Sequence, residues 1–279
     1  MSGPGRLDEQ AGERAARFRT EHHLGTQPLG DLPALIEQTT GIDVAVLDAG
    51  PDEHGLTMCD PLRGVVYIAV ARTSHPMRQR STLAHELAHV LFEDWNGGEL
   101  DAERSTVEVR ADAFARHLLV PVAGLHELLG SRDPAGPAVL SQVVQRFLVS
   151  PAIAGIALRD AGYIDEATRW SWREIMTPGI AARYGWADQY RALCAQSAQR
   201  RAPQRLLARA IDGYLARVVA AQTIASLRGM TVAEIEDELR AVGLVPVEHA
   251  AAWADPAELP DVALDLTVLD EDPPPGSTG

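Results

Sequence analysis

The strongest constraint on the fold of this 279-residue chain is a pair of histidines four residues apart, in the stretch TLAHELAHVLF. In an α-helix, positions i and i+4 lie on one face, so His85 and His89 can bind a single metal ion. Glu86 lies beside them, within reach of a water molecule at that ion, whereas Leu83 and Leu87 fall on the opposite face. The pattern H-E-x-x-H therefore predicts a helix with one face that binds zinc and one face that packs in the core. The alternative interpretation is an ordinary solvated helix face that carries these residues without a metal.

A catalytic zinc site needs a third protein ligand. Glu93 continues the histidine face, but it lies two turns from His85 on the same rigid helix and is too far away to close a tetrahedral site. Glu108 begins a second helix, which can bring a carboxylate to the ion from another direction. The spacing therefore favours Glu108. The other acidic residues in this part of the chain are Asp94, Glu99, Asp101, Glu103 and Asp112.

Asp112 follows Glu108 by one helical turn and lies on the same face. A histidine that binds metal usually donates its other ring N–H to a carboxylate or a carbonyl. We therefore expect Asp112 to accept this hydrogen bond, from His85. The alternative is a surface helix held by ion pairs with the nearby arginines Arg104, Arg110 and Arg116.

The segments RQRSTLAHELAHVLF and VEVRADAFARHLLVP resemble the ImmA/IrrE family of metallopeptidases, whose pattern is an H-E-x-x-H helix followed by E-x-x-A-[ND]-x-F-A-x-x-L-L-x-P. The resemblance is good over about 60–125 and continues more weakly to about 165. It implies a zincin-like fold, with strands beside two active-site helices. It also implies zinc as the metal, His85, His89 and Glu108 as its ligands, Glu86 as the general base, and a repressor encoded nearby as the kind of substrate.

The rest of the pattern predicts an α+β fold, in which a zincin-like peptidase domain with a small antiparallel or mixed sheet and the H-E-x-x-H helix precedes a mostly α-helical C-terminal region. Residues 31–41 predict a helix capped by Asp31 and ended by Gly41. Three apolar stretches, IDVAVLD, GLTMCD and GVVYIAV, predict strands, and the turn DPLRG predicts a hairpin between the last two. We expect GVVYIAV to be the edge strand that holds a peptide substrate.

The predicted domain organisation has four parts. Residues 1–130 form the peptidase domain, and the Gly/Pro-rich stretch GSRDPAGP follows it. Residues 131–175 form a helix-turn-helix-like segment packed on the peptidase domain, and residues 176–253 form a helical C-terminal region. Residues 254–279 carry acidic side chains, no basic ones and the run DPPPGSTG, so we expect this tail to be disordered.

The charge of the chain disfavours nucleic acid as a partner. The formal net charge is −14, which repels phosphates. The second helix of the helix-turn-helix-like segment, Pro151 to Ala161, consists almost wholly of Ala, Ile, Gly and Leu, a composition that packs against protein rather than reading bases. The Arg-rich segment 191–228 could bind nucleic acid, an acidic partner or the acidic tail, and its alternative is a solvated helix surface.

The chain shows no signal-peptide pattern and no apolar run long enough to span a membrane. Its two cysteines, Cys59 and Cys194, are far apart in sequence, which favours free thiols in a reducing compartment. We therefore expect a cytoplasmic protein without a membrane partner.

The sequence thus predicts a zinc-dependent endopeptidase with a regulatory protein as its substrate. Zinc would activate a water molecule, and Glu86 would take its proton and pass it to the leaving amine. A group that stabilises the oxyanion is not assigned: Tyr67 and His75 are candidates, whereas His117 lies half a turn off the Glu108 face. The alternative function is a non-proteolytic regulator that keeps the zinc fold and acts by binding a protein partner.

Overall fold

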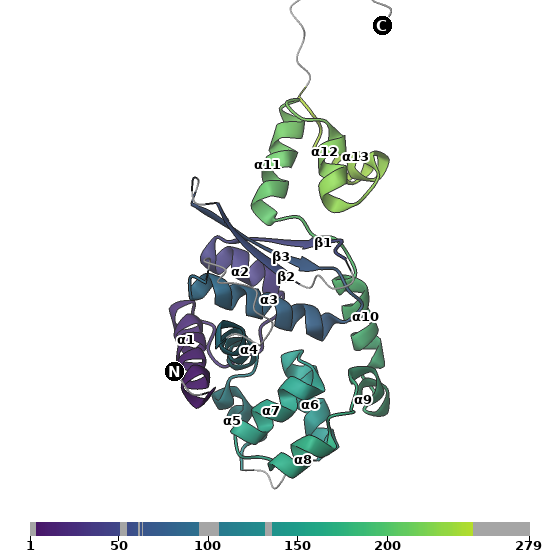
Figure 1. Ribbon diagram of the computed structural model, residues 1–279. Coiled ribbons are helices and arrows are strands. Elements are labelled where there is room, and N and C mark those ends of the chain that lie inside the picture. Colours follow the sequence, from purple (N-terminus) through teal and green to yellow (C-terminus); the bar gives the residue numbers. More distant parts are fainter. Residues whose placement is uncertain are drawn as a thin grey trace, which may run out of the picture.

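The computed structural model describes residues 4–50, 55–60, 62, 64–94, 106–131 and 136–247, and Figure 1 shows a small sheet surrounded by helices. The predicted α+β class is confirmed. In chain order the described elements are α1 Pro4–Glu21, α2 Leu32–Thr40, β1 Asp43–Leu47, β2 Gly55–Asp60, β3 Val65–Ala71, α3 Pro76–Leu91, α4 Thr106–Leu119, α5 Val122–Leu129, α6 Pro137–Phe147, α7 Pro151–Asp160, α8 Glu166–Ser171, α9 Thr177–Arg183, α10 Ala187–Ser197, α11 Gln204–Leu215, α12 Ala221–Arg228 and α13 Val232–Ala241.

The sheet is mixed and has the strand order β1-β3-β2. Strand β3 pairs in parallel with β1 and antiparallel with β2, which confirms the predicted hairpin. The expectation that GVVYIAV forms an edge strand is wrong, because β3 is central and hydrogen-bonded on both sides. Alternation of apolar residues shows that one face of a strand is buried, but it does not reveal which strands lie at the edges. Strand β2 is an edge strand instead.

Helix α3, which carries the H-E-x-x-H pattern, packs beneath the sheet together with α2 (Figure 1). The inner face of the sheet is apolar and fully buried at Val44 and Ile68, and Leu83 and Leu87 of α3 are equally buried. Their burial removes the apolar stripe of the helix from water and so fixes its rotation. As a result, the face with the two histidines points away from the sheet, toward α4.

Helix α2 has the predicted ends. The Asp31 side chain accepts a hydrogen bond of 3.0 Å from the backbone N–H of Ala34, and Gly41 adopts a left-handed conformation with φ of 71°. Such a conformation favours glycine, because a Cβ atom would be strained there. The turn after Gly41 leads directly into β1.

The segment predicted to resemble a helix-turn-helix folds as α6 and α7, which meet at a bend of 108°. Helix α7 buries Ala154, Ala157 and Leu158 in the main core. The indole N–H of Trp186 donates a buried hydrogen bond of 2.9 Å to the Ser141 hydroxyl and so ties α6 to the loop before α10. Within the described residues, no single helix is long and apolar enough to cross a membrane, although the bent pair α6–α7 is by length and composition.

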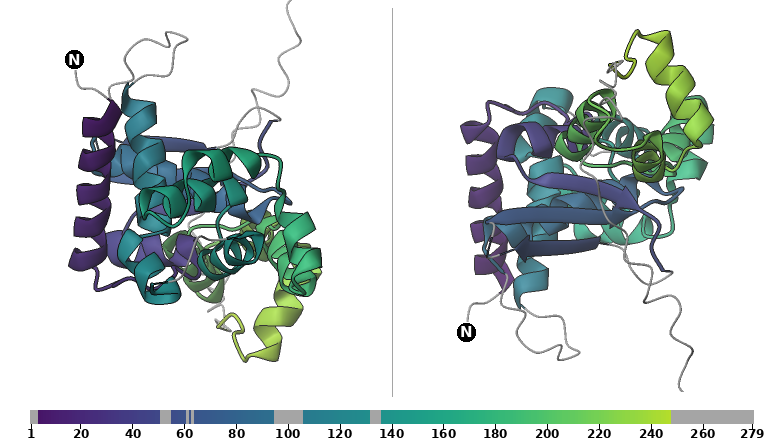
Figure 2. Two further views of the ribbon diagram at one scale, coloured as in Figure 1. Left: turned by 90° about the horizontal axis from the view of Figure 1, so that it is seen from below. Right: turned by 90° about the horizontal axis from the view of Figure 1, so that it is seen from above.

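Helices α11, α12 and α13 form a small unit with its own apolar core, centred on Ile224, Ala225 and Ile235. This unit lies on the opposite side of the sheet from α2 and α3 (Figures 1 and 2). The predicted division of the chain at residues 130, 175 and 253 stays a prediction, and the predicted acidic tail 254–279 lies outside the described residues.

Arginines of the Arg-rich segment attach the C-terminal region to the sheet. The backbone of Arg201 exchanges two hydrogen bonds with Val46, of 2.8 and 3.0 Å, and so covers the outer edge of β1. The guanidinium groups of three arginines in this segment form ion pairs within the protein, and this leaves less positive charge for an outside partner. The ion pairs that they form with the sheet and with α2 are Arg200–Asp48, Arg201–Glu37 and Arg205–Asp43.

Candidate metal centre

The two histidines of α3 point toward each other on the face that the sheet leaves free. Their Nε2 atoms lie 3.1 Å apart, and the two rings meet edge to face with their centroids 4.8 Å apart. Both side chains are mostly buried, with exposed fractions of 18% for His85 and 16% for His89. The spacing of one helical turn is the reason for this convergence.

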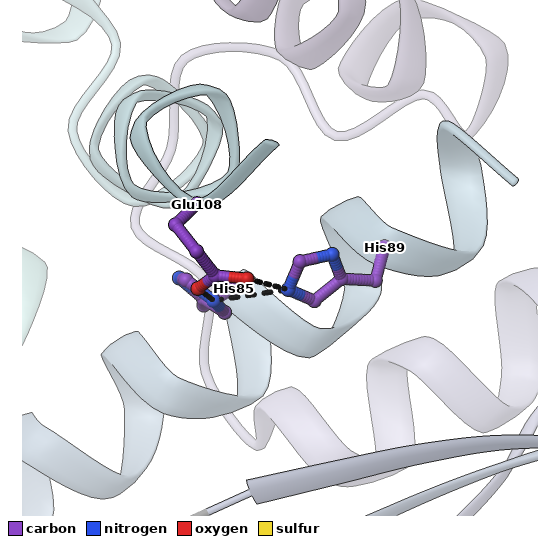
Figure 3. Close-up of side chains that lie close together, drawn as sticks. All are labelled: His85, His89 and Glu108. Carbon is purple, nitrogen blue, oxygen red and sulfur yellow. Dashed lines mark hydrogen bonds and ion pairs between the residues drawn. The ribbon is translucent and has the colours of Figure 1, made fainter. Parts of the chain in front are cut away.

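Glu108 reaches the same point from α4, which crosses α3 (Figure 3). Its Oε2 atom lies 3.1 Å from Nε2 of His85, and its Oε1 atom lies 3.5 Å from Nε2 of His89. The structure therefore brings the three residues predicted as metal ligands together. Among the described residues, they are the one group of three His, Cys, Asp or Glu side chains close enough to bind a common ion.

Each histidine has a carboxylate on its other nitrogen. Nδ1 of His85 lies 3.0 Å from Oδ1 of Asp112, and Nδ1 of His89 lies 3.4 Å from Oδ2 of Asp94. A carboxylate accepts hydrogen bonds, so Nδ1 is the nitrogen that carries the proton in each neutral ring. Arg110 in turn donates a 2.6 Å hydrogen bond to Asp94 and holds that carboxylate in place.

This pattern of protons leaves a cluster of lone pairs. With Nδ1 protonated, the Nε2 atoms of both histidines and the carboxylate of Glu108 all present lone pairs to the same small space. A tetrahedral zinc ion with ligand distances of about 2.0–2.1 Å places neighbouring ligand atoms about 3.4 Å apart. The observed separations of 3.1, 3.1 and 3.5 Å agree with this value, so the three side chains fit a zinc ion.

In the absence of metal, a proton is the alternative cation at this place. Burial alone would lower the pKa of His85, but the hydrogen bond to Asp112 and the negative charges of Asp112, Glu108 and Glu86 outweigh it. The net result is a raised pKa. The surroundings of His85 thus favour positive charge, which is what a site for a divalent cation requires.

Glu86, the predicted general base, is buried and held from the sheet side. The hydroxyl of Thr57 on β2 donates a hydrogen bond of 2.8 Å to Oε2 of Glu86. Gly55, two residues earlier on β2, makes room for this carboxylate: a Cβ atom there would lie 2.4 Å from Oε1 of Glu86. The edge strand therefore fixes the orientation of Glu86 through one hydrogen bond and one missing side chain.

A cleft of about 800 Å³ opens at the candidate metal centre. His85 and Glu86 lie on its wall, and Gly55 marks the side formed by β2. From there the cleft continues along α4 past Asp112 to Arg116. A volume of this size can accept substrate residues next to the metal.

The other candidate residues are not brought to this centre. Glu93 lies beyond the end of α3 in a left-handed conformation with φ of 57°. Glu99, Asp101 and Glu103 lie outside the described residues. His117 contacts Asp8 rather than Glu108. His75 precedes α3, about 15 Å along the helix from His85, and Tyr67 pairs in register with the exposed Met58 on the outer face of the sheet, away from α3.

Sequence reasoning missed the roles of Thr57, Gly55 and Asp94. The first two lie on β2, and nothing local in their sequence indicates that this strand runs beside Glu86. The sequence places Asp94 among the acidic residues near the histidines but does not indicate that it contacts His89. The turn at Glu93 carries Asp94 back to His89, whose backbone carbonyl accepts a 2.9 Å hydrogen bond from the N–H of Asp94.

A small mixed sheet, a helix with H-E-x-x-H and a carboxylate from a crossing helix define the zincin-like class of domain. Residues 37–159 match the Peptidase_M78 family, described as the IrrE N-terminal-like domain, and this segment belongs to that ImmA/IrrE family of metallopeptidases. Helix α1 and all elements from α8 onward lie outside the matched residues.

A structure described as a "Mycobacterium tuberculosis transcriptional regulator" is similar to part of the chain, with 23% sequence identity and a TM-score of 0.38. The similarity covers 55% of this chain and 55% of the other, so the chain spans about half the length of that protein. No curated protein matches the chain by sequence.

Proposed function

We propose that this protein is a zinc-dependent endopeptidase that cleaves a regulatory protein. The main support for this proposal is that two Nε2 lone pairs and the Glu108 carboxylate converge on one point, next to the buried carboxylate of Glu86. A structural zinc site has four protein ligands, whereas three protein ligands beside an open cleft leave a position for a reactant. When bound, zinc supplies Lewis-acid activation of water and of the scissile carbonyl.

The side chains of the protein then handle the proton. Glu86 accepts the proton of the attacking water and delivers it to the amine that leaves. Thr57 keeps the carboxylate of Glu86 in one orientation through its 2.8 Å hydrogen bond. Asp112 and Asp94 hold the two imidazole rings so that their Nε2 atoms face the metal position.

The edge of β2 is the surface we propose for the substrate backbone. This strand carries Gly55 and Thr57, both in contact with Glu86, and within the described residues no strand pairs with its outer side. An extended peptide added along this edge would gain backbone hydrogen bonds and pass close to the general base. We expect the substrate to be a cytoplasmic protein of the repressor type, encoded near this protein.

Replacement of Glu86 tests the proposal. Wild type and Glu86→Gln are loaded with zinc and incubated with each protein encoded beside the gene, and the products are identified by mass spectrometry. We expect the wild type to cleave one of them. The variant should bind as much zinc and cleave at least about 100-fold more slowly, because glutamine cannot accept the proton. If both forms bind a neighbour and neither cleaves it, the non-proteolytic regulator is the correct function.

A further inference from the structure

The cleft has an arm that the proposed hydrolysis does not use. Beyond the metal position it runs along α4 from Asp112 to Arg116, one helical turn further on, and its far end is formed by Asp8 of α1. Helix α1 lies alongside α4 (Figure 2) but outside the residues that match the peptidase family. The arm therefore includes a side chain, Asp8, that lies outside the matched domain.

The charged side chains that line the cleft are mostly acidic. Glu86, Asp112 and Asp8 contribute carboxylates, and Arg116 contributes the one guanidinium among the described lining residues. The side chains of Asp112 and Asp8 are half-exposed, with exposed fractions of 47% and 44%. Burial tends to raise the pKa of Asp8, but the hydrogen bonds and charges of Arg116 and, to a smaller extent, His117 outweigh it and hold that pKa below its usual value. Asp8 is therefore negatively charged at neutral pH.

Arg116 cannot act as a receptor for an acidic side chain. Its guanidinium group forms an ion pair with Asp8 and a second one, of 3.4 Å, with Asp160. It is also mostly buried, with an exposed fraction of 14%. An incoming carboxylate would have to displace Asp8, which faces the same space. The positive charge at the end of the arm is thus already neutralised, and a negative field remains.

The opposite wall of the arm is apolar. Ile153 and Ile156 of α7 are half-buried and line the cleft, and Ala113 of α4 lies between the charged positions. A long aliphatic stem can pack against such a wall while a charged group at its tip reaches a carboxylate. Leucine or methionine would fill the apolar part but would bring no positive charge to Asp8, which shares Arg116 with Asp160.

We propose that this arm, formed by Asp8, Asp112, Ile153 and Ile156, is a specificity pocket for an arginine or lysine side chain of the substrate next to the scissile bond. The aliphatic stem of that side chain packs against the two isoleucines, and its cationic group binds Asp8. The inference rests on the proposed peptidase function, and it defines the substrate segment as basic. It also assigns a role to the isoleucines of α7 that line the cleft.

The test compares peptides that differ at one position. The full-length, zinc-loaded protein is incubated with a pool of peptides whose central residue is Arg, Lys, Leu or Glu, and the cleaved bonds and rates are measured by mass spectrometry. We expect Arg and Lys to be preferred over Leu by about fivefold and Glu to be the poorest residue. Asp8→Asn should abolish most of the preference for Arg over Leu. Glu9→Gln, an exposed neighbour on the same helix, should leave that preference intact.

Equal rates for Arg and Leu, or a preference that Asp8→Asn does not change, would overturn the inference while leaving the peptidase function in place. If the wild type cleaves no peptide and no neighbouring protein, the peptidase function fails. In that case, the binding of the same peptides to the zinc-loaded protein, measured by fluorescence anisotropy, tests the proposed pocket. Tighter binding of the Arg peptide that is lost in Asp8→Asn supports the pocket, and equal binding of the Arg and Leu peptides overturns it.

Discussion

Asp112 and His85 face each other across two crossing helices, with Oδ1 of the aspartate 3.0 Å from Nδ1 of the histidine. The same helix α4 supplies Glu108 one turn earlier, so a single packing contact between α3 and α4 delivers both a metal ligand and the group that orients another ligand. The geometry of the metal centre therefore depends on how closely these two helices pack.

Removal of the Asp112 carboxylate should weaken metal binding. We expect Asp112→Ala to lower zinc affinity by about 10- to 100-fold, because His85 loses the acceptor that fixes its ring and its protonation. Competition with a chromophoric chelator measures this change. Asp165→Ala, which removes the capping aspartate of α8, is the matched control and should not alter zinc affinity. An unchanged affinity in the Asp112 variant would show that the contact does not support the metal.

The zinc content of single variants should distinguish the three proposed ligands from the nearby acidic residue Glu93. His85→Ala, His89→Ala and Glu108→Ala should each lose most of the bound zinc, whereas Glu93→Ala should keep it, since Glu93 lies past the end of α3. Elemental analysis of the purified proteins gives the zinc content, and far-UV circular dichroism checks that each variant is folded. Full zinc content in Glu108→Ala would remove Glu108 from the ligand set.

Gly55 should be necessary for catalysis, although it does not bind the metal itself. A Cβ atom at this position would lie 2.4 Å from Oε1 of Glu86, so Gly55→Ala must displace that carboxylate. We expect kcat/KM to fall about 100-fold, in line with the effect of a misplaced catalytic group, while the zinc content stays the same. Gly30→Ala, at a position where a Cβ atom meets open space, should have wild-type activity. Wild-type activity in Gly55→Ala would show that Glu86 needs no fixed position.

Because of the ion pair between Asp8 and Arg116, the free energy of unfolding should change with pH in the acid range. The folded pKa of Asp8 is lowered, so its stabilising contribution is present above the unfolded pKa near 4 and is lost as the pH falls through the folded value. At pH 7, we expect Asp8→Asn to reduce the free energy of unfolding by about 0.5–1 kcal/mol, a modest value because the side chain is half-exposed. The difference from wild type should vanish once the pH has fallen below the folded pKa of Asp8. Urea unfolding at pH 7 and through the acid range measures it, and a constant difference would contradict the assignment.

The contact between Glu37 and Arg201 should hold the C-terminal region on the sheet. The Glu37 side chain has an exposed fraction of 6%, and its carboxylate also accepts hydrogen bonds of 3.2 and 2.9 Å from the backbone N–H groups of Val44 and Gln204. We expect Glu37→Ala to reduce the free energy of unfolding by about 2–3 kcal/mol, because it leaves the Arg201 guanidinium and the backbone N–H of the buried Val44 without this acceptor.

Arg191→Ala is the control for this prediction. Arg191 forms an exposed ion pair with Asp188 within α10, and its removal should cost less than about 0.5 kcal/mol. Thermal and urea unfolding measure both variants. Equal effects would mean that the Glu37 network does not contribute more than an ordinary surface pair.

The sequence by itself determined the parts of the site that rest on helical periodicity. His85 and His89 lie one turn apart in any α-helix, and so do Glu108 and Asp112, so each pair must share a face. Likewise, the cap at Asp31 and the stop at Gly41 follow from local chemistry and are present in the structure. These features depend on neighbours within a few residues, which the sequence contains in full.

Only the tertiary structure decided how these local units meet. It placed β3 in the centre of the sheet and β2 at the edge, brought Thr57 and Gly55 to Glu86, and paired Asp8 of α1 with Arg116 of α4. Each of these contacts joins residues that are distant in sequence, and each depends on strand order or helix crossing rather than on periodicity. Burial of one face selects the rotation of an element, whereas the partners of its other face follow from the packing of the whole chain.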